Sequence, residues 1–173
     1  MKTKKIVLYS IIVLVILATL FSMIPIHIQR EIPAVYYRTD NTNYEVKTTI
    51  RLDGYLFHSP LFFRKKYTGK FIVDDIAFTK KEDAKTEFVM DSNSKKNGAN
   101  ISICYKQNGE YTSPNLGMLK MKGNLKEIKM LVWEPMDNSN QKTSKYLFLV
   151  APASNKEEAT KIANEFKKTN EIF

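Results

Sequence analysis

The amino-terminal run of apolar residues constrains this chain more than any other feature. Three lysines lie within residues 1–5, and no charged residue follows until after residue 26. A helix over residues 6–24 would extend roughly 28 Å, close to the ~30 Å hydrocarbon core of a bilayer. The run has no amphipathic stripe, unlike the surface helix of a globular domain. The sequence therefore predicts a transmembrane helix over residues 6–26, with the lipid bilayer as its partner.

The run fits either an uncleaved signal anchor or a cleaved signal peptide. It is longer than the apolar core of roughly 7–15 residues in a signal peptide, and no small-x-small cleavage site follows it closely. We therefore expect a signal anchor, with a secreted domain released by cleavage as the alternative. Three lysines precede the run, whereas His27, Arg30 and Glu31 follow it. The positive-inside rule then predicts a single-pass cell-membrane protein of the cell envelope, with a cytoplasmic N-terminus (residues 1–5) and residues 27–173 outside.

The net charge of +9 would suit a nucleic-acid-binding protein, but the distribution of the charge argues against that class. Three of the 27 basic residues precede the apolar run, which leaves +6 on the part expected outside. The basic residues comprise 23 Lys and four Arg, whereas Arg is the residue that recognises bases and phosphates through bidentate hydrogen bonds. We expect no nucleic-acid partner; another envelope protein, anionic lipid or an anionic wall polymer suits this surface.

The rest of the chain alternates between strand and turn patterns. Pro25, Pro33 and the polar residues of the segment 27–43 indicate a juxtamembrane connector over that segment. A folded extracytoplasmic domain is expected over 44–173, beginning with a clear apolar–polar alternation over 44–53. The turn pairs Asp53-Gly54, Asn108-Gly109 and Gly123-Asn124 predict tight hairpins. Two polar segments are expected to be loops: 91–100 and 136–144.

A helix is predicted at the C-terminus. Ser154 and Glu157 have the spacing of a capping box. Four apolar residues then recur at helical spacing and define one face: Ala159, Ile162, Ala163 and Phe166. The sequence therefore predicts an α+β fold, in which a transmembrane helix precedes a mainly antiparallel β-sheet domain with a C-terminal amphipathic helix on one sheet face.

The tetrapeptide Ser22-Met23-Ile24-Pro25 resembles the Ser-Met-x-Pro box of bacterial type I signal peptidases, which follows an amino-terminal anchor. The resemblance implies a membrane protease in which Ser22 is the nucleophile and a downstream Lys is its base. It covers only these four residues, and the other boxes of that family do not occur in the chain. We therefore expect no catalytic residues, and this protease is the alternative.

Metal and thiol chemistry have little support in the sequence. His27 and His58 are 31 positions apart without clustered Cys or carboxylates, and neighbouring Asp74 and Asp75 would point to opposite faces of a strand. We expect neither a metal nor a cofactor. The single Cys104 precludes an intrachain disulfide. We expect it to be a buried or half-buried packing residue, with an intermolecular disulfide as the alternative.

Two basic clusters are candidate contacts for an anionic surface. The first lies beside aromatic residues and contains Arg64, Lys65, Lys66 and Lys70. The second flanks the Gly123-Asn124 turn and contains Lys120, Lys122, Lys126 and Lys129. A solvated sheet face with edge-protecting lysines is the alternative explanation. The sequence thus predicts a non-catalytic binding, accessory or regulatory domain of unspecified ligand.

Overall fold

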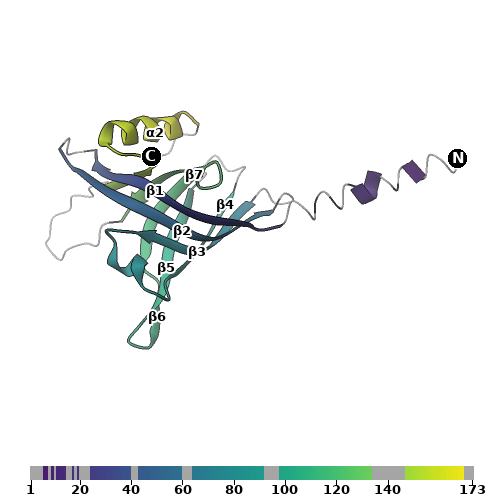
Figure 1. Cartoon of the computed structure of the whole chain (residues 1–173), viewed down its shortest axis with the longest axis horizontal. Coiled ribbons are helices and arrows are strands. Elements are labelled where there is room, and N and C mark those ends of the chain that lie inside the picture. The colour runs from purple at the N-terminus through teal and green to yellow at the C-terminus, as the bar shows by residue number, and fades with distance from the viewer. Residues whose placement is uncertain are drawn as a thin grey trace.

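The fold is a closed antiparallel β-barrel with a helix against its outer wall (Figure 1). The computed structural model describes residues 6, 7, 9, 11–14, 17, 19, 24–39, 43–59, 64–91, 98–133 and 147–169. Among these residues no helix has both the length and the apolar character that crossing a bilayer requires. The predicted antiparallel sheet is confirmed, whereas its closure into an eight-strand barrel was not expected from the sequence.

The barrel is a meander, because each of its strands pairs with its neighbours along the chain. The strands are β1 (Ile26–Arg38), β2 (Glu45–Ser59), β3 (Arg64–Val73), β4 (Lys85–Asp91), β5 (Gly98–Gln107), β7 (Asn115–Lys122), β8 (Glu127–Val132) and β9 (Leu147–Ala151). The pairing of β9 with β1 closes the circle. The short β6 (Glu110–Thr112) forms a hairpin with the end of β5. A 3-10 helix, η2 (Ala77–Lys80), follows β3, and α2 (Lys156–Thr169) follows β9.

Alternating side chains fill the barrel interior, as the period of a strand requires. On β2, Ile50, Leu52 and Leu56 are buried, whereas Arg51 and Asp53 between them are exposed. Aromatic residues from β3 and β4 pack in the same interior: Tyr67, Phe71 and Phe88. The interior is therefore a packed core rather than an open channel.

The segment expected to be a connector, 27–43, contains most of β1, so the folded region begins before residue 44. β1 pairs with β2 along almost its whole length. The strand tolerates Pro33 because the ladder between β1 and β9 begins only at Val35. Beside that ladder, the Pro33 carbonyl accepts a hydrogen bond from the Ala153 N–H (3.0 Å). Pro33 and the polar residues around it therefore led to a wrong prediction for a segment that forms a central strand.

The Asp53-Gly54 pair does not form the predicted hairpin, because it lies inside β2. Gly54 faces Gly69 of β3 in the register, and a Cβ atom on Gly54 would lie 2.8 Å from the Gly69 Cα. Glycine is therefore required here for a close approach of two strands. The other two predicted turns are confirmed, since Asn108 and Asn124 both have positive φ between paired strands.

The helix α2 packs on the outer face of β1, β8 and β9, which confirms the predicted apolar face. Ala159, Ala163 and Phe166 are buried, and Ile162 packs against the same cluster. The predicted cap is displaced by one residue, since Asn155 rather than Ser154 accepts from the backbone, at the Glu158 N–H (2.9 Å). The helix was expected to pack on one face of the sheet. That face is the outside of the barrel wall (Figure 1).

Candidate functional site

The barrel end at which β1 begins gathers basic side chains, and we call it the basic end: Arg30, His58, Arg64, Lys65 and Lys126. The β7–β8 hairpin folds over this end, held by the fully buried Leu125. Lys65 Nζ donates to Asn124 Oδ1 of that hairpin (3.1 Å), and Arg30 Nη1 donates to the Asn124 carbonyl (3.3 Å). Strand pairing sets His58 opposite Lys65. Burial, and then the charge of Lys65, lowers the pKa of His58, which favours its neutral form.

Closure of the barrel brings parts of the two predicted basic clusters together. Arg64 and Lys126 are exposed, and the contact of Lys65 with Asn124 joins the first cluster to the hairpin that carries the second. Lys66 is directed toward Glu87 of β4, with which it forms an ion pair (2.9 Å). Lys70 lies farther along β3, opposite Asp53. The ammonium of Lys122 lies 4.6 Å from the centre of the Phe166 ring on α2.

Lys120 and Lys129 do not belong to an exposed basic surface. They are cross-strand neighbours on β7 and β8, and they are only 8% and 5% exposed. Lys129 Nζ lies 5.2 Å from the centre of the Phe148 ring, so its stem lies along the wall that α2 covers. Burial lowers the pKa of Lys120. Both side chains lie outside the barrel, and the sequence could not indicate that α2 covers the wall there.

Apolar side chains are exposed beside the basic end, on the outer wall. They come from β1, β2 and β4: Ile26, Tyr55, Phe57 and Val89. Phe57 and Val89 flank Lys66 in the register of β2, β3 and β4. This end therefore presents cations and amphipathic or apolar groups side by side, a combination typical of surfaces at a lipid–water interface.

The opposite end of the barrel holds a half-open pocket of about 350 Å³, which we call the mouth pocket. Its lining is mainly apolar and aromatic, and includes Tyr44, Phe78, Leu116 and Trp133. The lining residues come from β1, β2, β7, β8, β9 and the η2 region. Sequence reasoning missed this site, because residues contributed by so many elements form no local motif.

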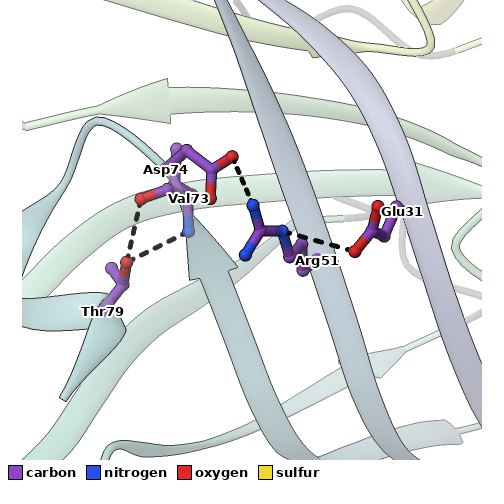
Figure 2. Close-up of polar contacts among 5 residues, drawn as sticks. All are labelled: Glu31, Arg51, Val73, Asp74 and Thr79. Carbon is purple, nitrogen blue, oxygen red and sulfur yellow. Dashed lines mark hydrogen bonds and ion pairs between the residues drawn. The ribbon is translucent and has the colours of Figure 1, made fainter.

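The turn after β3 forms one side of the opening of the mouth pocket, which we call its lip. Hydrogen bonds of the Thr79 hydroxyl and an ion pair of Asp74 fix this turn (Figure 2). The buried Thr79 hydroxyl accepts from the Val73 N–H (3.0 Å) and lies within donating distance of the Val73 and Ile76 carbonyls. Asp74 forms an ion pair with Arg51 of β2 (3.0 Å), and Arg51 also approaches Glu31 (3.5 Å). Asp74 therefore has a structural partner, while Asp75 lines the pocket.

Tyr36 of β1 combines burial with an unsatisfied polar group at the wall of the mouth pocket. The residue is only 4% exposed. Within the described part of the chain, its hydroxyl has no hydrogen-bond partner. Burial, and then the charge of Asp75, raises the pKa of Tyr36 far above its usual value. The group is therefore a neutral phenol that can donate a hydrogen bond.

The remaining chemical predictions have mixed outcomes. Ser22 and Met23 of the peptidase-like tetrapeptide lie outside the described residues. Cys104 is exposed rather than half-buried, because it faces outward on β5. Among the described residues, no three His, Cys, Asp or Glu side chains converge in a manner that could hold a metal ion.

Comparison with protein-family models, with curated proteins and with solved structures gives no match to this chain. A functional assignment therefore depends on the geometry of the two barrel ends alone.

Proposed function

We propose that this chain is a single-pass protein of the cell membrane, with a cytoplasmic N-terminus and a non-catalytic binding or accessory barrel outside. In this proposal the basic end of the barrel rests against anionic lipid head groups. The observation that carries it is the position of that end. β1 begins at Ile26, the last residue of the apolar run 6–26, so Arg64, Lys65 and Lys126 lie at the barrel end that the anchor would enter.

The energetics favour such a contact over a randomly oriented barrel. Each Lys or Arg close to an anionic membrane surface contributes about 1 kcal/mol, and the attraction decays over a Debye length of about 8 Å at physiological salt. The end of the barrel nearest the bilayer is therefore the only end whose charges act. The exposed Tyr55 and Phe57 next to the cations suit the interfacial zone, where aromatic side chains concentrate.

The proposal is tested by lysine footprinting of the full chain in vesicles of phosphatidylcholine, with or without phosphatidylglycerol. Acetylation at each lysine is read by mass spectrometry. We expect Lys126 to be protected in the anionic vesicles and to regain its reactivity at high salt. Lys80 on η2, at the opposite end, is the matched control and should react equally in both vesicles. Equal acetylation of Lys126 under all conditions would contradict the proposed contact.

The anchor itself is tested separately in the cells that make the protein. We expect the intact mass of the membrane fraction to include residues 1–26, and the chain to resist extraction at alkaline pH. A mature species that lacks these residues would replace the anchor with the alternative of a secreted domain. An active-site serine probe that labels Ser22 would instead revive the membrane-protease alternative.

A further inference from the structure

We propose that the mouth pocket binds a small, mainly apolar molecule that carries no negative charge and accepts a hydrogen bond from Tyr36. This site lies at the end of the barrel opposite the basic end, and it goes beyond the function proposed above. The proposed membrane contact would only orient the domain, whereas the mouth pocket would give the domain a ligand.

The size and lining of the pocket point to a small molecule. A volume of about 350 Å³ lies near the lower limit of small-molecule pockets, which is about 300 Å³. Apolar side chains from separate elements, among them Ile76, Leu116 and Leu147, form most of its walls. The core beneath is filled by buried residues such as Ile50 and Leu52. A ligand can therefore occupy the mouth of the barrel but cannot pass into its interior.

The Tyr36 hydroxyl gives the pocket a specific polar requirement. A buried donor that lacks a partner costs free energy, and a ligand acceptor placed against it would recover that cost. Tyr36 is almost fully buried and lines the pocket, and no described side chain or backbone group satisfies its hydroxyl. A carbonyl or ether oxygen on an otherwise apolar molecule is the complementary group.

The charge at the rim excludes anions. Asp75 contributes a carboxylate to the lining. The side chain of Asn115 is polar and uncharged, and the other residues of the lining are apolar or aromatic. The described lining contains no Lys or Arg. A carboxylate or phosphate ligand would lose its hydration and meet a like charge, whereas an uncharged ligand would not.

The test uses Trp133, which is the only tryptophan in the chain, lines the pocket and is 47% exposed. The full chain is held in phosphatidylcholine vesicles and titrated with 2-octanone, an uncharged ketone, or with octanoate, an anion of similar length. Octanoate does not absorb where tryptophan is excited, and the weak absorbance of the ketone there is corrected for in each titration. We expect 2-octanone to change Trp133 emission saturably. Octanoate should bind at least about tenfold more weakly.

Three variants separate the proposed site from non-specific partition into the protein or lipid. Tyr36→Phe should weaken 2-octanone binding by about threefold to tenfold, in line with one neutral hydrogen bond. Tyr111→Phe removes an exposed phenol on β6, outside the pocket lining, and should leave binding unchanged. Asp75→Asn should improve octanoate binding more than 2-octanone binding. A non-saturating response to 2-octanone, equal affinities of Tyr36→Phe and wild type, or preference of the wild type for octanoate would overturn the proposal. Loss of Lys126 protection would leave these outcomes unaffected, so the two proposals fail independently.

Discussion

Replacing Thr79 with valine tests whether one hydroxyl holds the lip of the mouth pocket. The β3–β4 ladder ends at Gly69↔Thr86, so Val73 at the end of β3 has no strand partner on that side. The Thr79 hydroxyl accepts from the Val73 N–H at 3.0 Å instead (Figure 2). Valine keeps the volume of threonine but cannot accept a hydrogen bond. The variant therefore leaves one buried backbone donor without a partner.

The loss in the free energy of unfolding depends on which backbone groups lose every hydrogen-bond partner in the variant. The Val73 carbonyl still accepts from the Ile76 N–H (2.9 Å), and the Ile76 carbonyl still accepts from the Thr79 N–H (3.1 Å). Only the Val73 N–H is orphaned, and an unsatisfied buried donor costs about 1–3 kcal/mol. We expect Thr79→Val to lower the free energy of unfolding by about 2 kcal/mol.

The assay is urea-induced unfolding followed by far-UV circular dichroism, with Thr79→Ser as the matched control. Serine keeps the hydroxyl and loses one methyl group, for which we expect a cost of about 1 kcal/mol. The midpoint should shift without a change in slope, since the surface exposed on unfolding is the same. A Thr79→Val protein at least as stable as Thr79→Ser would refute the reasoning, because packing rather than the hydroxyl would then fix the lip.

Two further predictions concern the barrel wall and the helix cap. Gly54→Ala should destabilise the fold by more than about 2 kcal/mol in the same assay, because its Cβ would meet the β3 backbone. Gly98→Ala is the control, since its Cβ would have ordinary 3.5 Å contacts. Equal effects of the two substitutions would contradict the close approach of β2 and β3. Hydrogen bonds from Ser154 to Glu158 lower the pKa of Glu158. Its contribution to stability is therefore complete above the unfolded pKa of about 4.3 and is lost as the pH falls through the lower folded value. Thermal unfolding of wild type and Glu158→Gln should differ at pH 7 and converge in acid; a constant difference would exclude this linkage.

Local sequence patterns predicted the elements whose causes are local. The apolar face of α2 and the turns at Asn108 and Asn124 follow from helical spacing and from residues that accept positive φ. The prediction of a connector over 27–43 was wrong because the cause of β1 is not local. Its place in the barrel depends on pairing with β2 and β9, which outweighs the low strand propensity of Pro33.

The Asp53-Gly54 error has the same origin as the missed pocket. A glycine that permits a hairpin and a glycine that lets two strands approach are identical in sequence, and only the opposing Gly69 distinguishes them. In the same way, Tyr36 is an ordinary strand tyrosine until the closed sheet sets it beside Asp75 and Trp133. Tertiary pairing carries both facts, and no window of the chain contains them.

Closure of the sheet also explains how one small domain can have two chemically different ends. An up-and-down meander of eight strands has all its chain reversals at two rims, and each rim collects side chains from alternate connections. The rim next to the apolar run is closed by the β7–β8 hairpin and its hydrogen bonds to Lys65 and Arg30. At the other rim, the 3-10 turn fixed by Thr79 contributes Ala77 and Phe78 to the lining of the mouth pocket. The packed interior between them separates the basic end, for which we propose a lipid contact, from the mouth pocket, for which we propose an uncharged ligand.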